Sequence, residues 1–401
     1  MNAAERRLIS YIAAAHGLVH IMELVYPALL SRIEDDFGVR SVVSGGIATL
    51  FGWAFGSSAI PSGFLVDRLG SRQVMVYAFF GGAVMATLAG LAPNEWFLAA
   101  ALAGLGLTIG LYHPAGLSAT SQGIRQRQMA LGLHGVAGNV GQALAPAIAV
   151  GLAIVIDWRA AFFFVAALSA GLGVMMAITH LPVHGEEEVQ ARPVPPADGA
   201  PRQRHALLIP LLVVYAGFVL SGMVYRGVIT FLPKHLEELV NDDFGAAFVT
   251  VALLMGAVGQ LVGGYLSHRV RLERLAPVIA IATVPPLALT AILSGAPLVI
   301  IASVFVFLYF MNQPVFTGLI ADYAPEGAVG RSFGISFFAG FGLGSLGGVI
   351  AGAFVDQWDT EAAFLAMTAI MGGAVLVTIA IWLLGERRGA EAVVAQPAGP
   401  S

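Results

Sequence analysis

The chain has 401 residues, of which 58% are hydrophobic and only 11% are charged. Soluble globular domains carry roughly 25% charged residues, so this composition excludes a soluble domain and predicts an integral membrane protein. The net charge of −4 gives no basis for a nucleic-acid partner, and the absence of cysteine excludes disulfides, thiolate metal sites and cysteine catalysis.

Long apolar runs follow one another along the chain. Each is about 20 residues long, the length that an α-helix needs to cross a bilayer, and none alternates as the strands of a membrane barrel do. The first half contains six predicted spans: 8–30, 43–66, 73–92, 96–119, 129–156 and a sixth that ends at Leu181. The second half contains six more: 206–232, 244–266, 275–294, 297–321, 329–355 and 361–384.

A polar segment separates the two halves. It contains Glu186, Glu187, Glu188 and five prolines, a composition typical of a flexible linker. We therefore predict four parts: an N-terminal six-helix bundle (1–181), a cytoplasmic linker (182–206), a C-terminal six-helix bundle (207–388) and a cytoplasmic tail (389–401).

Basic residues are distributed unevenly between the two sides of the predicted spans. Of the 20 Lys and Arg residues, Arg32, Arg40, Arg159 and Lys234 lie opposite the termini, and Arg226 lies inside a span. All the others lie on the side that holds both termini and the linker. Because cytoplasmic loops are enriched in Lys and Arg, we expect a multi-pass protein of the cell inner membrane, surrounded by lipid, with both termini in the cytoplasm.

The two halves align with each other at an offset of 200 residues. His16-Gly17 falls opposite Ala216-Gly217, and Tyr112-His113-Pro114 falls opposite Asn312-Gln313-Pro314. Paired six-helix repeats are a transporter architecture in which the substrate binds at the repeat interface near the membrane midplane. The predicted fold class is therefore an all-α membrane protein with twelve transmembrane helices in two pseudo-symmetric six-helix bundles.

Three ionisable side chains, His16, His20 and Glu23, lie within the first apolar run. Offsets of four and seven residues place them within about 60° of one another on a helix. Ionisable groups are costly against lipid, so this face is expected to point to protein or water. Glu23 is the candidate proton carrier, with His16 and His20 as further proton-handling groups, because a buried carboxyl group holds a proton more readily than an exposed one. The alternative is a structural role for Glu23 as the partner of Arg226 or His20.

Arg226 lies in the seventh span, close to Met223, the counterpart of Glu23 in the second half. A guanidinium group does not deprotonate, and it binds carboxylates and phosphonates through paired hydrogen bonds. Arg226 therefore either binds an anionic substrate or pairs with Glu23. Other polar and aromatic residues inside the spans are candidate substrate contacts: Tyr26, Tyr112, His113, Asn312 and Gln313. His134, near the end of the fifth span, is assigned a structural role.

A glycine- and arginine-containing motif follows the second span: Gly63-Phe-Leu-Val-Asp67-Arg68-Leu-Gly70-Ser-Arg72. It resembles the loop signature G-x-L-x-D-R-x-G-R-[KR] of the major facilitator superfamily, and Ser71 departs from that signature at the first of its two basic positions. The fifth span is similar to the glycine-rich antiporter motif of the same superfamily, but its proline does not directly follow a glycine; the matching residues are Gly135, Gly138, Gly141 and Pro146.

The resemblance implies a central cavity lined by the first, fourth, seventh and tenth helices. It also implies that Asp67 latches the cytoplasmic gate by pairing with the eleventh helix, while Gly63 lets two helices approach closely. Two shorter segments look like the fosmidomycin-resistance type of exporter: Leu111-Tyr-His113-Pro114-Ala-Gly116, and Pro27-Ala-Leu leading to an acidic loop that ends in Phe37-Gly38.

Two functions fit these residues. The first is a monomeric secondary active transporter that exports a small anionic or zwitterionic organic compound, drugs included, by alternating access coupled to protons. The second is a divalent metal transporter with His16, His20, Glu23 and His113 as imidazole and carboxylate ligands. A nutrient uptake symporter and a non-transporting receptor are further alternatives. We predict neither enzyme activity nor a cofactor, since the sequence contains no nucleophile–base pair, phosphate loop or cofactor signature outside the predicted pore.

Overall fold

The computed structural model describes residues 1–179, 208–325 and 328–394. The predicted linker at 182–206 lies outside these ranges, as do residues 395–401 of the predicted tail. Within the described ranges, twelve helical segments are long and apolar enough to cross a membrane, which confirms the predicted number of spans.

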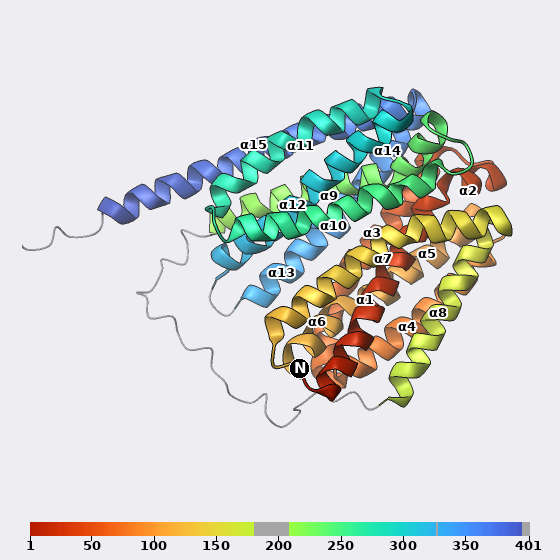
Figure 1. The fold of residues 1–401 in the computed structure, drawn as a ribbon, viewed down its shortest axis with the longest axis horizontal. Helices are drawn as coiled ribbons and strands as arrows, with labels where there is room; N and C mark the ends of the chain where they lie inside the picture. Colours follow the sequence, from red (N-terminus) through yellow and green to blue (C-terminus); the bar gives the residue numbers. More distant parts are fainter. Residues whose placement is uncertain (180–207, 326–327, 395–401) are drawn as a thin grey trace, which may run out of the picture.

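The helices form two groups that lie side by side (Figure 1). The first group consists of α1 (Ala3–Ala28), α2 (Leu30–Phe37), α3 (Ser41–Leu69), α4 (Ser71–Gly90), α5 (Glu95–Gly110), α6 (Tyr112–Gly123), α7 (Arg127–Val155) and α8 (Trp158–Ile178). The second consists of α9 (Leu208–Leu239), the short turn η2 (Gly245–Phe248), α10 (Val249–Ser267), α11 (Leu272–Ile292), α12 (Gly295–Tyr323), α13 (Val329–Phe337), α14 (Leu346–Gln357) and α15 (Thr360–Val394).

Two predicted spans are interrupted. The fourth divides into α5 and α6 at Leu111, because Pro114 has no N–H to donate to the preceding turn. The eleventh changes from α13 to a π-helical turn at Phe338–Gly342 and a 3₁₀ turn at Leu343–Ser345 before α14 begins. Glycine has low helix propensity, and this stretch contains three glycines within five residues.

Two segments predicted to be non-helical are helices. The acidic stretch after the first span forms α2, which lies at the end of the molecule opposite the N-terminus (Figure 1). Helix α15 continues to Val394, so residues 389–394 of the predicted tail extend the last span as helix.

Glycine packing joins the two groups where α3 lies against α14 and the π-helical turn before it. A Cβ atom on Gly45 would lie 2.3 Å from the carbonyl oxygen of Gly348, and one on Gly56 would lie 2.5 Å from the backbone nitrogen of Gly342. Small residues allow two helix backbones to approach this closely within a membrane. The contact therefore depends on the absence of side chains at these positions.

Charged groups join the two halves at the end away from the termini. Lys234 Nζ on α9 lies 2.6 Å from Glu34 Oε2 on α2, and Arg32 Nη1 lies 3.0 Å from Glu237 Oε1. The carboxylate of Asp356 on α14 accepts hydrogen bonds of 2.8 and 3.0 Å from the backbone N–H groups of the first two residues of α3. These bonds hold this end of the molecule closed.

Candidate functional site

A buried ion pair joins the two groups at the centre of the molecule. Arg226 Nη2 on α9 donates a hydrogen bond of 3.2 Å to Glu23 Oε1 on α1, and the two residues are 2% and 1% exposed. The Arg226 guanidinium also lies 5.7 Å from the centre of the Phe51 ring. Of the two roles predicted for Arg226, pairing with Glu23 is therefore present in this conformation.

Two histidines extend this pair into a chain of hydrogen bonds along α1. His20 Nδ1 lies 2.8 Å from Glu23 Oε2, and His20 Nε2 lies 3.1 Å from His16 Nε2. His16 Nδ1 lies 2.7 Å from the backbone carbonyl oxygen of His134. The predicted polar face of the first helix thus points into the protein, as its cost against lipid requires.

The number of hydrogen bonds in this chain depends on how many hydrogens its side chains carry. Three hydrogen bonds in series need three hydrogens, whereas ionised Glu23 with neutral His16 and His20 provides two. The third hydrogen belongs to Glu23 or to one of the imidazoles. When that hydrogen is present, all three contacts are hydrogen bonds, and the chain ends at the Arg226 guanidinium.

His113, at the start of α6, completes a cluster of three imidazoles. Its ring centre lies 5.3 Å from that of His16 and 5.4 Å from that of His20. One ring nitrogen from each of the three residues lies within 4.8 Å of the others. The buried Nε2 atom of His113 has no hydrogen-bond partner among the described residues.

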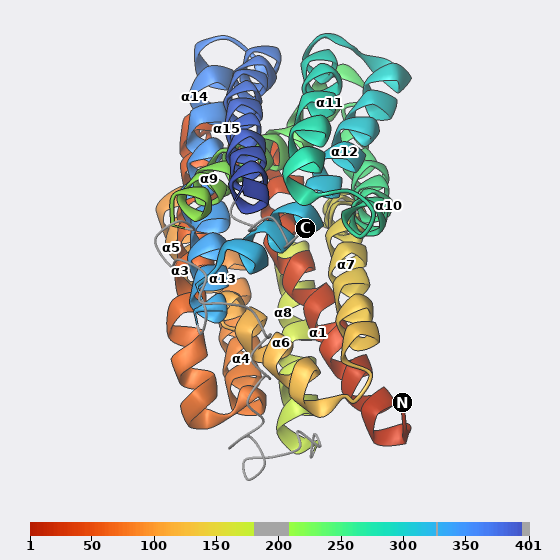
Figure 2. The same cartoon turned by 90° about the vertical axis from the view of Figure 1, so that its left-hand side faces the viewer.

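Glycines on α7 bring these groups together. A Cβ atom on Gly138 would lie 2.4 Å from the His16 ring, and one on Gly141 would lie 2.1 Å from the carbonyl oxygen of Gly17. The glycines that make this span resemble a glycine-rich motif therefore serve packing. They leave room for the polar face of α1 to lie against α7. Figures 1 and 2 both show α1 lying along α7.

Two residues on α7 belong to the site but were not predicted as functional. The ring of His134, which was assigned a structural role, stacks on His16 with ring centres 3.9 Å apart. The Gln142 amide nitrogen lies 3.3 Å from both His20 Nδ1 and the Tyr225 hydroxyl oxygen. The spacing of four residues from His134 to Gly138 and from Gly138 to Gln142 places all three on one helix face, a signal present in the sequence.

Two tyrosines predicted as substrate contacts use their hydroxyl groups inside the first half. The Tyr112 hydroxyl donates to the carbonyl oxygen of Ile12 at 2.6 Å and lies 3.1 Å from His134 Nε2. The Tyr26 hydroxyl donates to the carbonyl oxygen of Ser44 at 2.9 Å. In this conformation both tyrosines tie helices together.

The two candidate contacts on α12 differ in exposure. Asn312 is buried, and its Oδ1 atom has no partner among the described residues. Gln313 is exposed. Asn312 therefore has an unused buried acceptor, and Gln313 is not part of the buried cluster.

The loop motif covers the last turns of α3 and the start of α4, at the opposite end from the ion pairs between the halves. Asp67 and Arg68 are exposed, and Asp67 forms no hydrogen bond or ion pair with any residue in the described ranges. A Cβ atom on Gly63 would meet open space. The predicted latch to the eleventh helix and the predicted close helix approach are therefore both absent from this conformation.

Two other motif residues shape the turn into α4. Gly70 has φ 80°, which favours glycine, since other residues rarely adopt positive φ. Arg72 Nε and Nη2 donate to the carbonyl oxygens of Met176 at 3.0 Å and Ala177 at 2.5 Å. Arg72 thus caps the C-terminal end of α8, where a cation is favoured.

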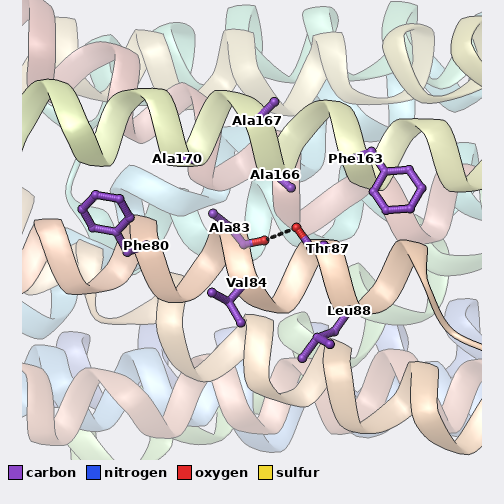
Figure 3. Close-up of a pocket in the computed structure, with 9 residues that line it drawn as sticks. All are labelled: Phe80, Ala83, Val84, Thr87, Leu88, Phe163, Ala166, Ala167 and Ala170. Carbon is purple, nitrogen blue, oxygen red and sulfur yellow. Dashed lines mark hydrogen bonds between the residues drawn. The ribbon is translucent and has the colours of Figure 1, made fainter.

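A hollow of about 550 Å³ lies between α4 and α8, away from the buried cluster (Figure 3). Its lining is apolar and includes Phe80, Val84, Leu88 and Phe163. The one hydroxyl group in it, that of Thr87, donates to the carbonyl oxygen of Ala83 at 2.8 Å. The hollow offers no chemistry for a polar substrate.

The comparisons with known proteins agree with this architecture. The sequence model of the Major Facilitator Superfamily matches residues 12–348, which is most of the chain. The chain belongs to this superfamily. A bacterial homologue of the human lysosomal transporter Spinster has the same fold, with a TM-score of 0.76 and 15% identity over 96% of both chains. The predicted fold class is confirmed, and the chain is a multi-pass membrane transporter and not an enzyme.

Curated relatives are similar at lower levels of identity. The "Probable L-galactonate transporter" of Escherichia coli (strain K12) is 23% identical over 61% of this chain and 58% of its own length. The gentisate transporter of Corynebacterium glutamicum is 25% identical over 82% of this chain and 75% of its own length. Both relatives are named as transporters of small organic molecules.

Proposed function

We propose that this protein is a proton-coupled secondary transporter of a small organic anion. Arg226 is the anion site, and Glu23, supported by His20 and His16, is the proton site. The observation that carries the proposal is the buried pair of Glu23 and Arg226, which joins the two halves where they meet.

The pair links the anion to the proton because Arg226 needs a counter-charge while it is buried. Leaving a buried charge without its partner costs about 3–5 kcal/mol, so Arg226 is satisfied either by ionised Glu23 or by an anionic substrate. When a substrate carboxylate takes Arg226, a proton neutralises the released Glu23. Anion and proton therefore favour each other's binding, and the two move in the same direction.

Export by antiport requires that the substrate and the proton compete for binding. A cationic substrate that paired with Glu23 would compete with the proton in this way. The sequence-based predictions of antiport, drug efflux and membership of the fosmidomycin-resistance branch rest on motifs away from this pair, and they stay predictions. The coupling between Glu23 and Arg226 favours symport of an anion.

The names of the two relatives agree with an anionic substrate, because L-galactonate and gentisate are both carboxylates at neutral pH. We place the protein in the cell inner membrane, with both termini in the cytoplasm, on the distribution of its basic residues. The end of the molecule that is closed by the ion pairs of Lys234 and Arg32 then faces away from the cytoplasm. A monomer is the expectation from its superfamily.

Transport into proteoliposomes tests the proposal. Purified protein is reconstituted, and uptake of radiolabelled sugar acids, hydroxybenzoates and small sulfonates is measured with and without an acidic exterior. We expect one anion class to accumulate only when the exterior is acidic, while the corresponding neutral sugar or phenol does not accumulate. Accumulation of an organic compound driven by an acidic interior would overturn symport, and equal transport of neutral compounds would overturn the anion site.

A further inference from the structure

Three imidazoles at the site, those of His16, His20 and His113, bring one ring nitrogen each close together. The Nε2 atoms of His16 and His20 face each other at 3.1 Å. Ligand nitrogens at about 2.0–2.1 Å from a tetrahedral zinc ion lie roughly 3.3 Å apart, so this separation is nearly that of two bound ligands. The third imidazole, His113, has a buried Nε2 with no partner in the described part of the chain, and its ligand nitrogen lies within 4.8 Å of the other two.

The outer ring nitrogens are held as they are in metal sites. A metal-bound histidine usually donates its second N–H to a carboxylate or a backbone carbonyl, which fixes the tautomer and turns the other nitrogen toward the ion. His20 Nδ1 lies 2.8 Å from Glu23 Oε2, and His16 Nδ1 lies 2.7 Å from the carbonyl oxygen of His134. When both Nδ1 atoms are donors, the two Nε2 lone pairs point at each other, and a cation bound between them removes this repulsion.

We propose that His16, His20 and His113 form a binding site for a divalent transition metal ion, with Zn²⁺ as the best-fitting member of the class. The ion replaces the hydrogen that His16 and His20 share. Imidazole ligands select Zn²⁺, Ni²⁺ and Cu²⁺ over Mg²⁺ and Ca²⁺, which prefer oxygen. A fourth position is left for water.

The charged groups nearest the site are one carboxylate and one guanidinium. Ionised Glu23 lies behind His20 and offsets part of the added charge, while Arg226, 3.2 Å from Glu23, adds a positive charge on the far side. The His134 ring stacks on His16 and contributes no net charge when neutral. The His113 ring has to shift by roughly 1.5 Å to reach the ion, given the expected Zn–N distances.

The ion is a regulator and not a cargo. All three ligands lie on α1 and α6, within the first half, whereas a transported substrate binds between the two halves. A metal ion held by one half stays with it as the halves reorient. It also occupies the position of the shared proton, so it blocks the proton path that the proposed function requires.

Calorimetry with Zn²⁺ alone tests the site directly. Full-length protein without an affinity tag is titrated in detergent and in the absence of any organic anion. We expect about one ion per chain, with release of about one proton on binding, because the shared hydrogen is displaced. His113→Ala weakens binding at least tenfold, and His268→Ala, which changes an exposed histidine outside the site, leaves binding unchanged.

Equal affinity in the wild type and in His113→Ala, or no binding at all, would overturn the proposal. Because His113→Ala is a change inside the packed cluster, zinc-edge X-ray absorption of the wild type provides a second measurement. Three imidazole nitrogens at about 2.0–2.1 Å support the site, and an all-oxygen shell contradicts it. Neither measurement depends on transport, so failure of the anion proposal leaves the metal proposal testable.

Discussion

The first helix of each half shows how two related bundles have come to differ. Glycine is shared at Gly17 of α1 and Gly217 of α9, in keeping with the offset between the halves. Elsewhere α1 carries ionisable groups where α9 carries apolar ones: His16, His20 and Glu23 stand opposite Ala216, Leu220 and Met223. Within the predicted span 206–232, the one charged residue is Arg226, which stands opposite Tyr26. The histidines and the carboxylate of α1 and the permanent cation of α9 are therefore on different halves, and they meet only when the halves assemble.

This division explains why the ion pair is informative about mechanism. A pair within one half would move as a unit and could serve packing alone. A pair between the halves must either be kept or be replaced by other partners each time the halves reorient. Substitutions at its two residues are therefore informative about the reorientation.

Removing the positive charge of Arg226 from α9 is expected to have the largest effect, because it eliminates the pair between the halves. Arg226→Gln leaves Glu23 buried without its partner and is expected to lower the free energy of unfolding by about 3–5 kcal/mol. Anion transport should fall at least about 100-fold, since the same interaction energy is lost from substrate binding. Thermal unfolding in detergent and flux in proteoliposomes measure the two effects.

The double variant Glu23→Gln with Arg226→Gln is the matched control. It replaces both charges by amides of similar shape, so most of the lost stability should return while transport stays absent. Recovery of transport in the double variant would show that Arg226 is a structural partner only.

Adding one methyl group to α7 tests the packing that holds the polar face of α1. In Gly138→Ala the new Cβ would lie 2.4 Å from the His16 ring, and we expect a loss of about 1–3 kcal/mol because the ring must move. Gly135→Ala, one turn earlier on the same helix, meets no atom within 4 Å and serves as control. Equal unfolding temperatures for the two variants would contradict the packing account.

Weakening the closed end should change which conformation the halves prefer. Asp356→Ala removes the carboxylate that caps α3 across the interface, a loss of about 1 kcal/mol or a factor of roughly five in the conformational equilibrium. The chain has no cysteine, so Val42→Cys can be introduced as a single reporter for a membrane-impermeant maleimide. Labelling should be about fivefold faster with Asp356→Ala, and an unchanged rate would mean that other contacts hold this end closed.

The loop motif gives the smallest expected effect. Asp67 has no partner in the described part of this conformation, so Asp67→Asn should leave the unfolding temperature unchanged. Its charge is available to the opposite conformation, where a carboxylate near a helix N-terminus contributes about 0.3–1 kcal/mol. Transport should therefore fall about two- to fivefold at normal expression, and full transport by this variant would exclude the latch.

Local features of the sequence were sufficient for the spans and for the polar face of α1. Apolar length gives the helices, and a spacing of three and four residues gives the face, because both are set by helix geometry. The 200-residue offset correctly predicted that Arg226 can pair with Glu23, because equivalent positions in two related bundles lie at equivalent depths in the membrane.

Other site features depend on which helix lies beside which, and local patterns do not contain that information. His134 and Gln142 reach the site only because α7 packs against α1 through its glycines. Conversely, Tyr26 and Tyr112 sit on helices that form the site, but their hydroxyl groups find carbonyl partners inside the bundle. Side-chain direction on a helix is set by rotamer and neighbour, so residue type and span alone did not predict it.

The most direct test of proton–anion coupling is the affinity for the transported anion as a function of pH. If one proton binds Glu23 with each anion, the Kd of the wild type should rise by up to tenfold per pH unit once Glu23 ionises in the free protein. In Glu23→Gln the side chain cannot ionise, so the Kd should be independent of pH while the anion still binds at Arg226. A pH-independent Kd in the wild type, or the same slope in Glu23→Gln, would contradict coupling through this pair.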